Sequence, residues 1–316
     1  MRVRTIAVRF CFLTCLVCGG IGYFAGWPLT AQSKAVQQGF ATPQAAADAL
    51  VQAAQDYDVP ALKRILGPGS EDLVAPTDAV QNRNRAREFA SKAREQESVD
   101  VDPKNPSRAT LTIGTDGWPF PIPIVMRGDK WYFDTKSGRQ EILMRRIGQN
   151  ELDAIAVARG FVDAQKEYAE TSEGHQYAQH IISTPGKKDG LYWTNPDGSP
   201  GGPLATVIAK ALQEGYSVTK PTPYHGYYFK ILKGQGPAAR LGQLDFVTHG
   251  LMIGGFALAA APAEYRVTGV KTFIVSHDGV VYQKDLGPNT LKIFQAMDRY
   301  NPDKTWRETD DEWSPR

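Results

Sequence analysis

The sequence predicts an α+β protein of two small domains, each with helices packed on an antiparallel sheet. Apolar residues recur at helical spacing in two regions, 43–97 and 150–171. Short runs of alternating or continuous apolar character follow each region, and turns containing glycine separate these runs. Helices followed by a set of short strands are typical of the α+β class.

The first 31 residues predict a secretory signal peptide. Three arginines precede an uncharged, mostly apolar stretch from Phe10 to Gly26, and Pro28 and Ala31 supply a helix break and a small residue for cleavage. The alternative is an uncleaved anchor, because the stretch approaches the roughly 17 residues that span a bilayer. We favour cleavage because three glycines interrupt the stretch. The protein is therefore expected to be exported.

Composition excludes several classes of function. All three cysteines lie in the signal segment, so the mature chain is expected to lack disulfides, thiol nucleophiles and cysteine-bound zinc. Removal of three arginines from 36 basic residues leaves 33 against 34 acidic ones, which does not indicate a nucleic-acid partner. The basic cluster from Asn82 to Arg94 is interpreted as a solvated helix face. No second apolar run predicts a membrane span after signal cleavage, and the oligomeric state is not predicted.

The N-terminal α+β domain is assigned to residues 32–137. Thr42 is expected to cap a first helix, and Asp58 a second that stops at Gly67. A third helix is expected from about Asp78 to Glu97. Strands are expected at Arg108–Ile113, Ile122–Arg127 and Lys130–Phe133.

Four aromatic residues flank these strands: Trp118, Phe120, Trp131 and Phe133. We favour a role in the sheet core over a binding pocket, because aromatic side chains are ordinary fillers of pleated surfaces. The order of elements resembles the NTF2-like domains. That resemblance implies a cup in the sheet, which in such domains often holds a small molecule or a partner peptide.

Residues 138–171 are expected to connect the two domains. Asn150 is interpreted as the N-cap of a long helix whose wide apolar arc packs on both domains or along the C-terminal sheet. Arg145, Arg146 and Glu151 lie where this helix is expected to begin. A structural salt-bridge cluster is favoured over an anion site there.

The C-terminal α+β domain is assigned to residues 172–300, and residues 301–316 to a polar tail. A long loop, Gly174–Gly202, precedes a short helix that begins near Pro203 and is ended by Gly215. The stretch from Tyr224 to Gly287 then predicts an antiparallel meander with two loops that carry histidines.

Several long blocks of the sequence carry a family resemblance: RRIGQNELDAI, SPGGPLA, YHGYYFKILKGQGPAA, LMIGGFALAAAPAEY, TGVKTFIVSHDGVVYQKDLG and NPDKTW. In this order they resemble the bacterial family known as domain of unknown function 2950. The resemblance spans most of the mature chain and implies no activity or catalytic residue. Together with the expected signal peptide, it implies an exported protein of the periplasm or cell envelope of a bacterium.

The C-terminal half is also loosely similar to the globular heads of type II secretion pseudopilins. The similarity rests on a long helix followed by a Gly-Tyr-x-Phe strand at Gly226, an Ala-x-Pro strand end at Pro262 and a final turn at Asp278 and Gly279. It implies a long helix laid across an antiparallel sheet. The segment before Glu151 is not apolar, so assembly through a membrane helix is not implied.

Candidate site residues lie in the loops of the C-terminal half. No catalytic residue is assigned; the weak candidates are His225, His249 and Asp278, which with Glu264 as an alternative ligand could form a zinc site if they converge. Histidines bonded to backbone carbonyls are the favoured interpretation, and no metal or cofactor is expected. Aromatic rings with polar tips could line a ligand groove; the ligand-binding candidates are Trp193, Tyr224, His225, Tyr228 and Tyr265.

Two classes of function follow. We favour a non-catalytic binding or assembly factor in the cell envelope, with an envelope protein or cell-wall component as its partner. The alternative is an envelope hydrolase or metal-dependent enzyme with its site at the loops from Tyr224 to His249. No Gly-x-Ser-x-Gly or His-Glu-x-x-His string supports the enzyme.

Overall fold

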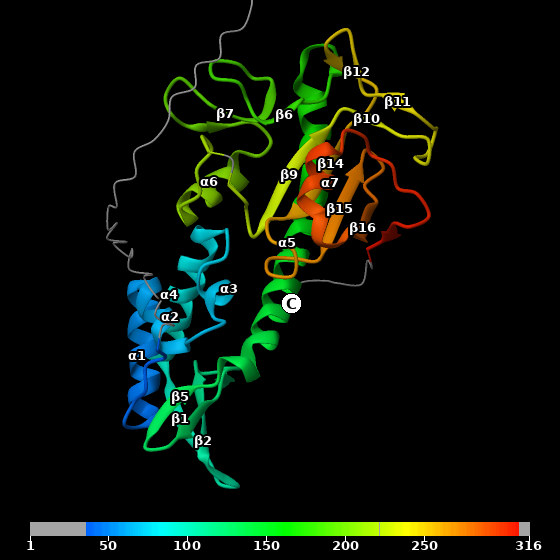
Figure 1. Cartoon of the computed structure of the whole chain (residues 1–316). Helices are drawn as coiled ribbons and strands as arrows, with labels where there is room; N and C mark the ends of the chain where they lie inside the picture. Colours follow the sequence, from blue (N-terminus) through cyan, green and yellow to red (C-terminus); the bar gives the residue numbers. More distant parts are fainter. Residues whose placement is uncertain (1–35, 221, 310–316) are drawn as a thin grey trace, which may run out of the picture. The chain divides into compact units, whose positions relative to one another are not determined.

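The computed structural model describes residues 36–220 and 222–309 and has the expected α+β fold (Figure 1). The expected signal peptide lies outside the described residues. Buried apolar side chains form two hydrophobic clusters, one in the N-terminal layer and one in the C-terminal layer. No helix within the described ranges is long and apolar enough to cross a membrane.

The N-terminal layer packs helices on a small antiparallel sheet. The helices are α1 (Pro43–Asp56), α2 (Val59–Leu66), α3 (Glu71–Val74) and α4 (Ala79–Glu95). The strands are β1 (Glu97–Asp102), β2 (Asn105–Ile113), β3 (Trp118–Pro119), β4 (Ile124–Arg127) and β5 (Lys130–Phe133). They are ordered β1-β2-β4-β5, and β3 also pairs with β2.

Side-chain caps stabilise the N-termini of the first two helices, as expected. The Thr42 hydroxyl accepts a hydrogen bond from the Ala45 amide, and the Asp58 carboxylate accepts one from the Ala61 amide. These bonds satisfy backbone donors that the first helical turn cannot pair internally. The sequence did not predict β1, which is an edge strand with no fully buried side chain.

Helix α5 (Thr135–Thr171) joins the two layers as one uninterrupted helix of 37 residues. The expectation that Asn150 caps this helix is wrong, because the helix begins 15 residues earlier, directly after Asp134. Neither Gly138 nor Gly148 ends it, since an isolated glycine weakens a helix without breaking it. Asn150 is instead completely buried in the middle of α5.

The C-terminal layer is an antiparallel sheet ordered β17-β16-β15-β14-β9, covered by α5 (Figure 1). Its strands are β9 (Tyr227–Leu232), β14 (Ala257–Pro262), β15 (Lys271–Ser276), β16 (Val281–Asp285) and β17 (Arg307–Glu308). The expected meander is present as β14 to β16, with β9 added beside β14. Helix α7 (Thr290–Ala296) also contacts β14.

Shorter elements surround this sheet. Helix α6 (Ala205–Glu214) ends at Gly215, whose φ of 104° lies in the left-handed region, as expected for a helix stop. The remaining short strands are β6 (His180–Ile182), β7 (Gly190–Thr194), β8 (Pro200–Gly201), β10 (Gly234–Gln235), β11 (Leu244–Asp245), β12 (Val247–Thr248) and β13 (Leu251–Met252).

Candidate functional site

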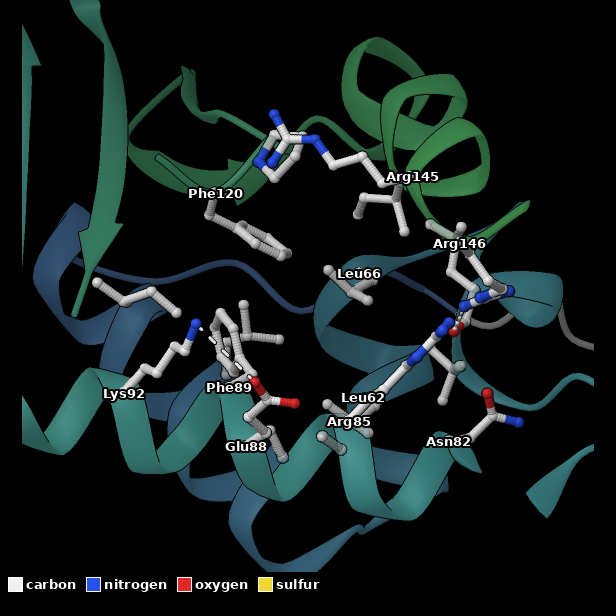
Figure 2. A pocket seen from close by; sticks show the side chains of 18 of the residues that line it. Leu62, Leu66, Asn82, Arg85, Glu88, Phe89, Lys92, Phe120, Arg145 and Arg146 are labelled. Atoms are coloured by element: carbon white, nitrogen blue, oxygen red, sulfur yellow. Dashed lines mark hydrogen bonds and ion pairs between the residues drawn. The ribbon is translucent and has the colours of Figure 1, made fainter. Parts of the chain in front are cut away.

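The N-terminal layer contains a pocket of about 540 Å³, within the range of small-molecule sites (Figure 2). Its walls come from α1 to α5, β2 and the segment that carries β3. The apolar part of the lining includes Leu62 and Leu66 on α2, Phe89 on α4, Phe120 after β3 and Ile142 on α5.

Helical periodicity explains how α4 and α5 contribute several side chains each. On α4, Asn82, Arg85, Phe89 and Lys92 are spaced by three or four residues and therefore share one face of the helix. On α5 the same spacing brings Ile142, Arg145, Arg146 and Gln149 to the pocket. Both helix faces combine apolar and basic residues.

Two arginines lie together at one side of the pocket. Figure 2 shows the guanidinium groups of Arg85 and Arg146 turned toward each other. The Arg85 Nη2 donates to the Asn150 Oδ1 at 2.9 Å, and Arg146 donates to the backbone carbonyls of Asp72 and Leu73 at 2.6 and 2.7 Å. Among the described residues neither arginine has an ion pair with a carboxylate.

The pKa values of these two arginines report their surroundings. Burial lowers the pKa of Arg85 below its ordinary value. Burial, together with the neighbouring charge of Arg85, lowers the pKa of Arg146 to about 10. A guanidinium with a pKa of about 10 remains charged at neutral pH, so the pocket wall carries two adjacent positive charges.

Two further cations line the pocket from other directions. The Arg145 guanidinium lies 5.1 Å from the centre of the Trp118 ring and contacts Glu141 at 2.7 Å. Lys92 lies 3.9 Å from Glu88, which is the only acidic residue of the lining. The lining therefore contains four basic side chains and one carboxylate around an apolar interior.

The interpretation of Asn82–Arg94 as a solvated helix face holds for only part of the cluster. Arg87 is exposed, but Arg85 and Lys92 point to the pocket. The sequence did contain a signal for this: Arg85 and Lys92 fall on the same helical face as Phe89, whereas a solvated cation usually lies opposite the apolar side.

The four aromatic residues of the sheet divide between the two roles considered for them. Trp131 and Phe133 are buried in the N-terminal core, as favoured from the sequence. Trp118 and Phe120 line the pocket, which is the alternative. The rings of Phe89 and Phe120 lie 5.3 Å apart and form part of one apolar wall.

The predicted site residue His225 is held between two carboxylates outside this pocket. Its Nδ1 lies 2.8 Å from the Asp153 Oδ2 on α5, and its Nε2 lies 3.1 Å from the Glu214 Oε2 at the end of α6. The ring stacks on Tyr224 with centroids 4.1 Å apart. Because the carboxylates occupy opposite ring nitrogens, the histidine joins two helices to the segment before β9.

The other predicted site residues lie on separate elements. His249 lies in the turn between β12 and β13, and the Asp278 carboxylate accepts hydrogen bonds from Ser276 and the Val280 amide within a turn. Glu264 contacts Thr77 instead of a histidine. Within the described residues, no group of three or more His, Cys, Asp or Glu side chains is arranged to hold a metal ion.

Most of the ligand-binding candidates also lie on separate elements and contact other residues. Trp193 on β7 donates to the Asn195 Oδ1 at 3.1 Å, and Tyr265 contacts Asp285 at 3.2 Å. Tyr228 on β9 packs against the C-terminal core. Of the five candidates, only Tyr224 and His225 are in ring contact with each other among the described side chains.

The contacts of His225 with Asp153 and Glu214, here called the histidine clamp, predict that the stability of the protein depends on pH. Burial alone would lower the pKa of His225, but the hydrogen bonds to Asp153 and Glu214 outweigh it and raise the pKa above the ordinary 6.5. The folded chain therefore binds this proton more tightly than the unfolded chain. The stabilisation is fully present below about pH 6.5 and is lost as the pH rises through the folded-state value.

We expect His225→Asn to be about 2 kcal/mol less stable than the wild type at pH 6, and this difference to shrink toward pH 9. Asparagine suits the left-handed backbone at this position, where φ is 48°. Urea unfolding of both proteins between pH 5.5 and 9 measures the difference. A difference that stays constant or grows with pH would show that the clamp does not bind a proton.

The fold and the pocket define an α+β protein with a small-molecule-sized pocket in its N-terminal layer. Residues 37–309 match the model of the family described as "Protein of unknown function (DUF2950)", and the chain belongs to this family. No curated protein and no solved structure matches the chain. The similarities to NTF2-like domains and pseudopilin heads are therefore not confirmed.

Proposed function

We propose that the protein is a non-catalytic binding protein of the bacterial cell envelope, and that its N-terminal pocket holds a small molecule with a largely apolar body. The observation that carries the proposal is the pocket of about 540 Å³ with leucine, phenylalanine and tryptophan in its walls. An apolar recess of this size favours an apolar ligand because burial of its surface is worth roughly 25 cal/mol per Å². Export rests on the N-terminal sequence pattern.

The geometry around His225 favours binding over hydrolysis. Both ring nitrogens are bonded to carboxylates, and no serine or threonine hydroxyl is hydrogen-bonded to the ring among the described residues. A general base must accept a proton from a nucleophile or from water, so a ring nitrogen has to be available. A structural role for His225 is the better account of these contacts.

Binding of an uncharged apolar dye tests the proposal. We expect N-phenyl-1-naphthylamine to bind the wild type with one site per chain and an increase in fluorescence. Ala86→Trp, on the α4 face that lines the pocket, should weaken binding at least about tenfold because the indole fills the space of the ligand. Equilibrium titration of the dye fluorescence measures both affinities.

The matched control is Ala209→Trp, which makes the same change on α6, away from the pocket lining. Circular dichroism establishes that both variants fold. We expect the control to bind like the wild type. Equal affinity of the folded Ala86→Trp variant, or no binding by the wild type, would rule out the pocket as the site.

A further inference from the structure

Positive charge predominates among the side chains that line the pocket. Arg85, Lys92, Arg145 and Arg146 belong to the lining, and Glu88 is the single acid. Glu88 already contacts Lys92, and Arg145 contacts Glu141. The two remaining cations, Arg85 and Arg146, are the more buried ones and lie beside each other (Figure 2).

The hydrogen-bond partners of Arg85 and Arg146 are neutral oxygens. Arg85 donates to an amide side chain, and Arg146 donates to two backbone carbonyls. Such partners satisfy N–H groups but do not neutralise the charge. Two adjacent cations, Arg146 buried and Arg85 half-buried, repel each other and have lost part of their hydration, so they destabilise the ligand-free pocket.

Carboxylates near this pair are engaged with other groups. Asp72 is paired with Arg139, and Glu264 is bonded to Thr77. Asp78 accepts from Tyr216 and from two backbone amides, while Asp153 is bonded to His225 and Gln149. None of these four carboxylates belongs to the pocket lining. Carboxylates nearby still attract the pair over longer distances. Among the described residues, however, none forms an ion pair with either arginine, so an anion that enters the pocket would meet two guanidinium groups without a direct carboxylate partner.

The apolar walls restrict what that anion can be. Phosphate or sulfate alone would leave the surfaces of Leu62, Leu66, Phe89 and Phe120 in contact with water or empty space. An uncharged apolar molecule would leave the arginine pair without a counter-ion. A molecule with one anionic head and an apolar body satisfies both parts of the lining.

On this basis we propose that the ligand of the pocket is a free anionic amphiphile, such as a single-chain carboxylate, whose head contacts Arg85 and Arg146 and whose body lies against the leucine and phenylalanine walls. This inference rests on the proposed function, because it names the ligand class of the same pocket. The guanidinium fork suits a carboxylate, with which it forms charge-assisted hydrogen bonds.

A matched pair of ligands tests the inference with the full-length protein. Decanoate and decan-1-ol have the same chain and differ in the charge of the head at pH 7.5. Each is titrated against the protein with bound N-phenyl-1-naphthylamine, and displacement gives its affinity. We expect decanoate to bind about 10- to 100-fold more tightly than decan-1-ol, the range for a hydrogen bond to a charged group.

Substitutions locate the charge that produces this preference. Arg85→Gln should lose most of the decanoate preference, whereas Arg85→Lys should retain much of it. Arg87→Gln is the matched control, because Arg87 lies two residues away on the same helix, is exposed and does not line the pocket. It should behave like the wild type. A preference that is unchanged in folded Arg85→Gln and in folded Arg146→Gln would overturn the assignment.

The outcomes separate the two proposals. Equal affinity for decanoate and decan-1-ol would overturn the anionic ligand but leave the apolar pocket standing. Failure of the dye and of both ligands to bind would overturn both. The last measurement uses vesicles of phosphatidylglycerol, which present an anionic head group on a bilayer instead of on a free molecule. Sedimentation of the protein with these vesicles, without displacement of the dye by decanoate, would overturn the assignment to a free amphiphile.

Discussion

Gly138→Ala is expected to destabilise the protein by about 3 kcal/mol, or to prevent folding, because helix α5 contacts the chain before β4 at this glycine. A β-carbon at position 138 would lie 2.3 Å from the Pro121 carbonyl oxygen and 2.6 Å from the Ile122 backbone. These neighbours are backbone atoms and cannot rotate away, so the overlap forces the helix and the segment apart. Pro121 lines the pocket, so dye affinity should fall as well.

The same helix supplies matched controls for this substitution. A β-carbon at Gly148 or Gly160 would meet no atom within 4 Å. Alanine at either position should stabilise the protein by about 0.5 to 1 kcal/mol, since it restricts the unfolded chain and favours the helix. Chemical denaturation of the three variants measures these changes. A Gly138→Ala variant as stable as the wild type would show that α5 does not approach Pro121 this closely.

Asn150→Ala is expected to cost about 3 kcal/mol because the side chain joins three segments without contact with water. Its Oδ1 accepts hydrogen bonds from the Gln81 Nε2 and the Arg85 Nη2, both at 2.9 Å. Its Nδ2 donates to the Thr268 carbonyl at 2.8 Å. Alanine leaves all three partners without these bonds, and one of the partners is a charged arginine.

The adjacent residue provides the control for this prediction. Gln149 is exposed, and its side chain donates a hydrogen bond to Asp153. Gln149→Ala should therefore change the free energy of unfolding by less than about 0.5 kcal/mol. Urea denaturation followed by circular dichroism measures both variants. If the two alanine variants were equally stable, Asn150 would not hold α4, α5 and the segment before β15 together.

Local signals in the sequence predicted the elements that local interactions stabilise. Thr42 and Asp58 cap helices as expected, and Gly215 ends one, because each acts through its own backbone neighbours. Asn150 was misinterpreted for the same reason. Asparagine is a good cap, but its environment here is set by α4 and Thr268, which are distant in sequence. Strand β1 was missed because pairing with β2 stabilises it, while none of its side chains is fully buried.

The pocket could not be predicted from the sequence because its walls converge from segments between Leu50 and Gln149. The aromatic pair Trp118 and Phe120 was recognised as either core or pocket, and only the packing of α4 and α5 decides between these roles. The histidines were candidates because an imidazole can act as a base or bind a metal ion. The structure places His225 between two carboxylates. The helical pattern predicts a solvated face for Arg85 and Lys92, and a salt-bridge cluster is the favoured interpretation of Arg145 and Arg146, whereas all four line the pocket.

A crystal structure of the protein with decanoate tests the central claim most directly. We expect density for the acyl chain between the leucine and phenylalanine walls, with its carboxylate within hydrogen-bond distance of Arg85 and Arg146. The arginine contacts to Asn150 and to the α3 carbonyls should persist. An empty pocket in crystals that contain decanoate above its dissociation constant, or decanoate bound elsewhere on the chain, would contradict the account.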